Sequence, residues 1–273
     1  MIERFVGGSR LAGLGLACLL AASAGAQQPA APAAGTPATE TRDVDEEALA
    51  VVQRMTDALG KATSLRFEIE SSYDAVQTDG EKIEFGARRT ITIHRPDRLR
   101  SDLVDRSGDQ RTVRYDGQQL VMSDPEQKVW AAVPRTDNLD ELVDYVTEEL
   151  GVPMPLSELF SPELPQILGE RMLSGRYVGR GTLRGVPYDH VAFRNEEVGV
   201  QLWIAREGDP LLQRIVITYE NAVDEPQYRA DFDEWDLSLR TPDSLFTFEP
   251  PKDFERIAFV PRKQRAAVQE VGR

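Results

Sequence analysis

The sequence is poor in the residues that carry out covalent and metal chemistry in most enzymes. Its 273 residues include one cysteine, Cys18, and two histidines, His94 and His190, which lie far apart with no neighbouring histidine at a ligand spacing. If the chain is cut after Ala26, the mature protein has no cysteine, which excludes disulfides, thiolate metal sites and a cysteine nucleophile. We therefore expect a protein that is not an enzyme and that uses no metal or other cofactor.

Long apolar runs are also missing. The longest, residues 11–22, is shorter than the roughly 20 residues that a membrane-spanning helix needs. It follows a start that carries Arg4 and Arg10 and precedes Ala24–Ala26, a small-residue cleavage pattern, so we predict a signal peptide over residues 1–26. No transmembrane segment is expected after its removal. Acylation at Cys18 is the alternative, but the apolar core continues beyond that residue, which favours cleavage after Ala26.

Positive charge is scarce relative to negative charge. The chain has 32 Lys and Arg against 46 Asp and Glu, for a formal net charge of −14. A polyanion of this size is a poor partner for nucleic acid or for anionic lipid surfaces, so we expect no nucleic-acid partner.

Composition divides the chain into four parts. Residues 27–43 are rich in Pro and Ala without large apolar side chains, which predicts a disordered linker, and residues 261–273 are expected to be a flexible tail. The folded domain is predicted over residues 44–260. It begins with an amphipathic helix over residues 44–59, in which Leu49, Val52, Met55 and Leu59 share one face.

From Ser64 the apolar residues recur every second position, as in a β-strand with one buried face. Strand breaks at Pro96 and turns such as Asp116–Gly117 predict a meander of antiparallel strands up to Pro134, and a second meander from Gly175 to Pro251. Residues 138–168, between the meanders, predict a helical segment that continues into a proline-rich one. This order fits one strongly curved antiparallel sheet with helices on its concave face.

Two other patterns suggest chemistry at first sight. The acidic stretch 231–236 lacks the Gly and Glu positions of a calcium loop, and on a strand its Asp231 and Asp233 form a solvated face. The glycine-rich stretch 175–185 lacks the Lys-Ser/Thr ending of a phosphate loop. The apolar strand face itself has two interpretations, a packed core or a ligand cavity, and the sequence leaves both open.

Several stretches resemble a known family: "HRPDRLR" (94–100), "YDGQQLVMSDPEQKVW" (115–130), "QLWIAREGDPLLQRIVITY" (201–219), "DFDEWD" (231–236) and "FTFEPP" (246–251). Together with the exported leader, they resemble an uncharacterised bacterial family of predicted periplasmic proteins, which is grouped with the lipoprotein carriers LolA and LolB. The resemblance implies a mainly β fold with α, namely a half-open antiparallel barrel whose concave face is covered by helices. It also implies a periplasmic location and a non-enzymatic role.

The function expected from this resemblance is binding of a lipid or an acylated, lipoprotein-like ligand in an apolar cavity, with the helix 44–59 and the insert 138–168 as a lid. An envelope protein-interaction or stress-sensor module without a bound lipid is the alternative, so an envelope protein is the second possible partner. The expected cavity residues are Leu65, Phe67, Ile69, Ile83, Phe85, Ile91, Ile93, Leu142, Val146, Leu159 and Phe160.

Overall fold

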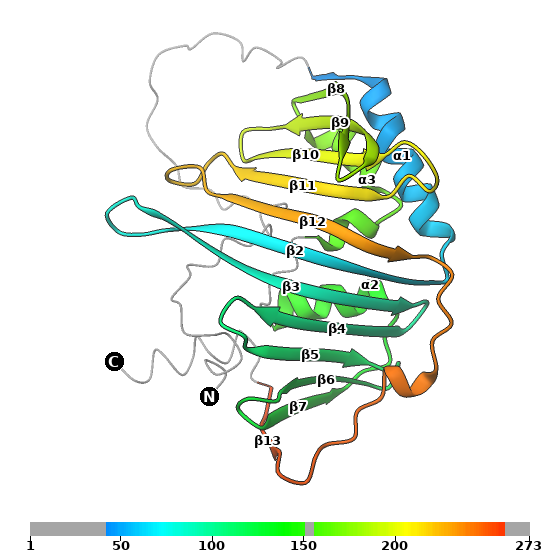
Figure 1. Ribbon diagram of the computed structural model, residues 1–273, viewed down its shortest axis with the longest axis vertical. Helices are drawn as coiled ribbons and strands as arrows, with labels where there is room; N and C mark the ends of the chain where they lie inside the picture. The colour runs from blue at the N-terminus through cyan, green and yellow to red at the C-terminus, as the bar shows by residue number, and fades with distance from the viewer. Residues whose placement is uncertain (1–41, 151–155, 260–273) are drawn as a thin grey trace, which may run out of the picture.

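The computed structural model describes residues 42–150 and 156–259. The expected signal peptide (1–26), the expected tail (261–273) and the expected linker up to residue 41 lie outside these ranges. One sheet dominates the described part of the chain (Figure 1). Its order is β1-β8-β9-β10-β11-β12-β2-β3-β4-β5-β6-β7-β13, which makes 13 strands in the described ranges.

The strands are β1 (Asp43–Val44), β2 (Ser64–Val76), β3 (Lys82–His94), β4 (Arg98–Asp105), β5 (Gln110–Tyr115), β6 (Gln119–Asp124), β7 (Val129–Pro134), β8 (Ser174–Leu183), β9 (Val186–Arg194), β10 (Val198–Ala205), β11 (Leu212–Tyr219), β12 (Gln227–Asp236) and β13 (Glu255–Arg256). The helices are α1 (Glu46–Lys61), α2 (Leu139–Asp144), the π-helical turn η2 (Tyr145–Glu149), the 3₁₀ turns η3 (Ser157–Phe160) and η4 (Asp243–Leu245), and α3 (Leu164–Arg171). None of the helices in the described ranges is long and apolar enough to span a bilayer.

Two antiparallel meanders, β2–β7 and β8–β12, are joined where β12 pairs with β2. The two ends of the sheet are the short strands β1 and β13, which pair in parallel with β8 and β7. The sheet is therefore open, and the predicted half-open, antiparallel architecture is confirmed. The two parallel edge strands were not predicted, because two residues are too few to show a strand pattern.

The turns follow from local chemistry. At the β5–β6 turn, Gly117 has φ +77°, a conformation that favours glycine, and the Asp116 carboxylate accepts hydrogen bonds from the amides of Gln118 (3.0 Å) and Gln119 (2.9 Å). Pro96 lies between β3 and β4, where the sequence predicted a break.

Helix α1 starts two residues later than expected, because Asp43–Val44 forms β1, and it ends two residues later, at Lys61. Glu46 and Glu47 suit its N-terminus and Lys61 its C-terminus. Asp45 occupies the N-cap position, but its carboxylate accepts a hydrogen bond from the Tyr177 amide (3.2 Å) and makes none to the helix. The cap residue therefore ties α1 to β8.

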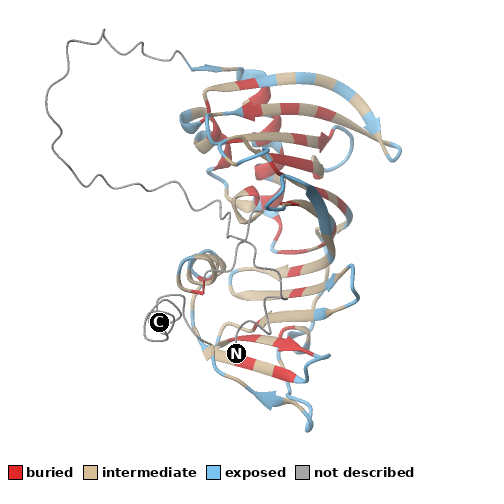
Figure 2. Ribbon diagram, turned by 90° about the vertical axis from the view of Figure 1, so that its left-hand side faces the viewer, coloured by how far each residue is buried: buried red, intermediate tan, exposed pale blue. Residues whose placement is uncertain are grey.

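The expected insert 138–168 is several short pieces. Asn138 forms a capping box with Glu141 at the start of α2, which passes directly into η2. Residues 151–155 lie outside the described ranges, and η3 and α3 follow them. Figure 2 shows the sheet as a curved wall with the helices on its concave side.

The buried apolar residues form two separate clusters. The α1 cluster joins α1, α3 and η3 to β2 and β9–β12, and its largest members include Met55, Leu59, Leu65, Phe67, Phe193, Leu202 and Phe232. The α2 cluster joins α2 and η2 to β5 and β6, and its buried members are Tyr115, Leu120, Leu142 and Leu150.

Candidate functional site

The strand register shows which side chains share the concave face. Residues paired across antiparallel strands point to the same side of a sheet. Phe67 pairs with Ile91 and Leu65 with Ile93, while Ile69 lies opposite both Phe232 and Arg89. Because Leu65, Phe67 and Phe232 belong to the cluster beneath α1, this shared face is the concave one.

Most of the expected cavity residues lie in or against the α1 cluster. Leu65, Phe67, Ile69 and Leu159 are buried, and Ile91, Ile93 and Phe160 are partly buried against them. The Phe67 ring stacks on Trp235 with centroids 4.5 Å apart and on Phe160 at 5.3 Å. Phe67 is fully buried among rings, so at this point the face is filled by the protein's own side chains.

Two of the expected residues belong to the α2 cluster instead. Leu142 is buried there, and Val146 is partly buried beside it. Tyr115, beneath them on β5, donates a hydrogen bond from its hydroxyl to the Asp137 carbonyl (2.6 Å), just before α2. The strand residue thereby holds the N-terminal end of this short helix.

The last two expected residues, Ile83 and Phe85, share the concave face but lie outside both clusters. Ile83 is 40% exposed and Phe85 is 38% exposed. Phe85 stacks on Tyr73, its partner across the β2–β3 hairpin, with centroids 5.9 Å apart. The hairpin extends beyond the neighbouring strands (Figure 1). The eleven expected residues therefore lie on one face but at three places along it.

Arg89 also lies on this face but was not among the expected site residues. It occupies an inward position of β3, between Ala87 and Ile91, and donates a hydrogen bond to the Ser101 hydroxyl on β4 (2.9 Å). Burial lowers the pKa of Arg89, and the nearby Tyr228 hydroxyl on β12 opposes that shift. A charged residue in an otherwise apolar alternation was the signal that could have revealed it.

Tyrosines continue this polar region. Burial raises the pKa of Tyr228, with a smaller opposing effect from Ser71 and Arg89, and burial also raises the pKa of the nearby Tyr219. The Ser101 hydroxyl is bonded to Arg89, and the Tyr228 hydroxyl lies close enough to affect its pKa; both hydroxyls can donate and accept hydrogen bonds.

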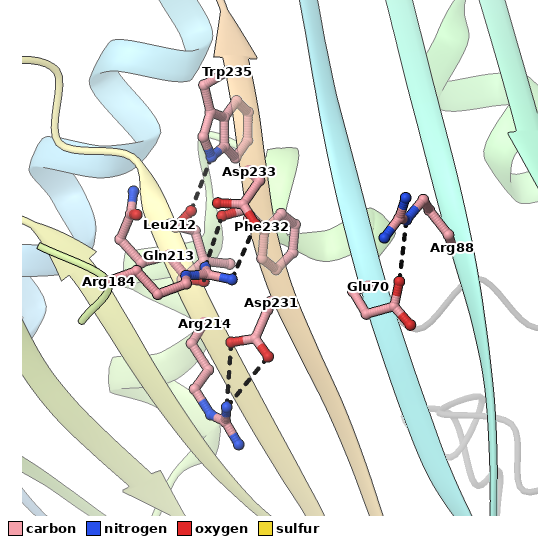
Figure 3. A network of polar contacts seen from close by, with 10 residues as sticks. All are labelled: Glu70, Arg88, Arg184, Leu212, Gln213, Arg214, Asp231, Phe232, Asp233 and Trp235. Carbon is pink, nitrogen blue, oxygen red and sulfur yellow. Dashed lines mark hydrogen bonds and ion pairs between the residues drawn. The ribbon is translucent and has the colours of Figure 1, made fainter. Parts of the chain in front are cut away.

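On the convex face, two aspartates of the acidic motif of β12 form ion pairs (Figure 3). Asp231 pairs with Arg214 (3.2 Å) and Asp233 with Arg184 (3.0 Å), as expected for a solvated strand face. Glu234, with φ +54°, makes a β-bulge after which Trp235 packs in the α1 cluster and donates its indole N–H to the Leu212 carbonyl (2.9 Å). In residues 42–150 and 156–259, no three metal-ligating side chains gather in one place.

The two histidines do not form a catalytic pair. His190 on β9 stacks on Trp203 with centroids 4.2 Å apart and contacts the Gln201 amide oxygen at 3.2 Å, and burial lowers its pKa. His94 on β3 contacts the Thr241 hydroxyl at 3.3 Å. Strands β9 and β3 are five positions apart in the sheet, or about 24 Å at the usual strand spacing.

A buried carboxylate fastens α1 to the sheet. Asp189 on β9 accepts hydrogen bonds from the Tyr177 hydroxyl (2.7 Å) and from Arg54 of α1 (2.9 Å), and Arg206 lies 3.2 Å away. At the other end of the helix, Arg95 donates to the carbonyls of Leu59 (3.0 Å) and Ala62 (2.6 Å). These contacts have an evident structural role and leave α1 firmly held.

Comparison with known proteins gives one family and several distant folds. The family model described as predicted periplasmic protein (DUF2092) matches residues 48–260. No curated protein matches the chain. The lipoprotein LppX of Mycobacterium tuberculosis is 12% identical, with a TM-score of 0.46 over 72% of this chain and 98% of that one.

Two further solved structures are similar over comparable lengths. MucB of Pseudomonas aeruginosa, solved in complex with MucA, is 15% identical with a TM-score of 0.41, over 74% of this chain and 61% of that one. A LolA superfamily protein of Nitrosomonas europaea is 10% identical with a TM-score of 0.35, over 75% and 97% of the two chains. At these identities the likeness concerns the fold alone.

Proposed function

We propose, from the premise that this chain belongs to the DUF2092 family of predicted periplasmic proteins, that it is a non-enzymatic protein that holds a lipid or an acylated ligand against its concave face. The family description confirms the periplasmic location predicted from the leader. What we propose is that the chain binds a ligand and that this ligand is a lipid or an acylated molecule.

The observation that carries the proposal is the division of the helical cover. A sheet with one apolar face buries it most completely under a continuous layer, yet here the α1 and α2 clusters are separate. At their facing borders on β3 and β4, Ile91, Ile93 and Leu99 are only partly buried. An acyl chain laid along this border would gain about 0.8 kcal/mol for each methylene that it buries.

The cover over the border is built from short elements. Helix α2 has six residues and passes into a π-helical turn, while η3 has four residues. Short helices have little stability of their own and depend on packing, so such segments can open and close at low cost. We infer that α2, η2 and η3 admit the ligand while α1 stays fixed.

Lipid mass spectrometry tests the proposal directly. The protein is purified from a bacterial periplasm without detergent, washed, denatured and extracted. We expect an acyl-containing species close to one equivalent per chain. A protein that emerges empty, and that binds no acyl compound when one is offered, would contradict the proposal.

Variants locate the ligand on the face. Ile69 is buried in the α1 cluster, so Ile69→Asp should unfold the domain and is unsuitable as a cavity probe. Ile91 is partly buried at the border, so Ile91→Asp should abolish retention of the acyl species while the circular dichroism melt keeps a cooperative transition. Val104→Asp is the matched control, because Val104 is 40% exposed and lies outside the border. Unfolding of the Ile91 variant would instead identify a packed core there.

An envelope protein-interaction or stress-sensor module is the second candidate. The exposed Ile83 and Phe85 on the projecting hairpin favour it, because such apolar groups suit a partner surface. A periplasmic pull-down that loses one partner in Phe85→Ser, together with a lipid-free protein, would support this candidate over lipid binding.

A further inference from the structure

The concave positions of the central strands carry one charge. On β2 and β3 these positions are Leu65, Phe67, Ile69, Ser71, Tyr73, Ala75, Ile83, Phe85, Ala87, Arg89, Ile91 and Ile93. All except Arg89 are uncharged. An arginine at the centre of an apolar face is costly to desolvate, so a protein retains it there only where the charge has a use or a partner.

Arg89 pairs with no carboxylate among the residues that the structure describes. In the described ranges no carboxylate oxygen lies within ion-pair distance of Arg89, whereas Arg88, the next residue, pairs with Glu70 (3.2 Å), and Arg100 on the neighbouring strand pairs with Asp102 (2.7 Å). The one hydrogen bond of Arg89 within those ranges goes to the neutral Ser101 hydroxyl. A guanidinium carries five N–H donors and stays protonated at neutral pH, so four donors have no acceptor among the described residues.

Polar groups lie near Arg89, and apolar side chains lie further along β3. Ser101 on β4 and Tyr228 on β12 supply hydroxyls near the guanidinium. Two residues further along β3, Ile91 starts the apolar border of the proposed acyl site, and Phe160 of η3 packs against the same cluster. A ligand with a charged group at Arg89 would therefore extend its chain along Ile91 and Ile93.

We propose that Arg89 binds the anionic group of the ligand, a phosphate or carboxylate, so that the preferred ligand is an anionic amphiphile. This inference rests on the proposed acyl-binding function and specifies its ligand class. Phosphate and carboxylate oxygens match the planar guanidinium fork, and the neighbouring hydroxyls donate to oxygens that the fork does not reach. Because the chain has a net charge of −14, selection of an anion must come from contact at this site and not from long-range attraction.

Two probes that share an acyl chain separate the two proposals. Lysophosphatidylglycerol is anionic, and monoacylglycerol of the same chain length is neutral. Each is titrated into the delipidated full mature chain by isothermal calorimetry, below its micelle-forming concentration. We expect the wild-type protein to bind the anionic probe about tenfold more tightly, as one charge-assisted contact allows.

The variants use two adjacent arginines on opposite faces. Arg89→Gln should remove the tenfold preference and leave affinity for monoacylglycerol unchanged, and Arg89→Lys should restore part of the preference. Arg88→Gln is the matched control, since Arg88 pairs with Glu70 on the convex face (Figure 3), and it should bind like wild type.

Other results would overturn one proposal or both. Equal binding of both probes by the wild type would refute the anion site and leave acyl binding intact. Absence of binding by both probes would refute acyl binding itself. Equal losses for both probes in a folded Arg89→Gln would assign Arg89 a purely structural role, with the melting curve of Arg89→Lys as the check on folding.

Discussion

The two halves of the concave face are covered in different ways. Over β8–β12 and β2 lies α1, a 16-residue helix with six buried residues, tied to the sheet by Asp45, Arg54 and Arg95. Over β4–β7 lies α2, a six-residue helix with one buried residue, Leu142, tied at its N-terminal end by the Leu139 amide bonded to the Pro96 carbonyl (3.0 Å).

This difference separates a scaffold from a cover. A helix that buries a broad stripe against several strands gains most of its stability from that packing and cannot leave without unfolding the domain. A short helix that buries one leucine can leave at the cost of a local opening. The α1 half is then the scaffold, and under the proposed function the α2 half is the cover that opens for the ligand.

The largest expected effect comes from the α1 half. Phe67→Ala removes a fully buried ring that stacks on Trp235 and Phe160, so it should lower the free energy of unfolding by about 3–5 kcal/mol. Urea denaturation followed by circular dichroism measures this loss. A loss below about 1 kcal/mol would show that the α1 cluster is loosely packed and would remove the basis for calling it a scaffold.

A smaller and local effect is expected in the α2 half. Leu142→Ala should cost about 2 kcal/mol, the low end for buried leucines, because the cluster around it is small. Hydrogen exchange should then speed up at the amides of residues 142–149 and stay unchanged in α1. Equal acceleration in both helices would mean that the two halves unfold as one unit.

Much of the fold was predictable because it depends on local patterns. The alternation in "LRFEIESSYDA" (65–75) placed Leu65, Phe67 and Ile69 on one face, and the register confirms that they share it. The strand break at Pro96 was predictable for the same reason, since proline cannot continue a central strand.

The candidate site was less predictable because it depends on contacts between distant residues. Periodicity gives the same inward direction to Phe67, which is packed core, and to Phe85, which is 38% exposed on the hairpin. What separates them is the extent of the helical cover, which no strand pattern encodes. Alternation along β3 places Arg89 on the inward face and Arg88 on the outward face, but only the structure shows that Arg88 pairs with Glu70 while Arg89 bonds to the neutral Ser101 hydroxyl.

The smallest expected effect concerns the start of the cover. The Asn138 side chain accepts hydrogen bonds from the amides of Asp140 and Glu141, both at 3.0 Å, and the Glu141 carboxylate accepts one from the Asn138 amide at 3.0 Å. Asn138→Ala removes the first two bonds and should destabilise α2 by about 1 kcal/mol. Because α2 is a cover, we expect this loss to appear as faster association and dissociation of an acyl probe in stopped-flow fluorescence, with global urea stability nearly unchanged. Gln53→Ala in α1, which removes an exposed hydrogen bond to Asp57, is the matched control and should leave both rates as they are. If Asn138→Ala lowered global stability while probe kinetics stayed constant, α2 would be part of the scaffold, and the distinction between the two halves would fail.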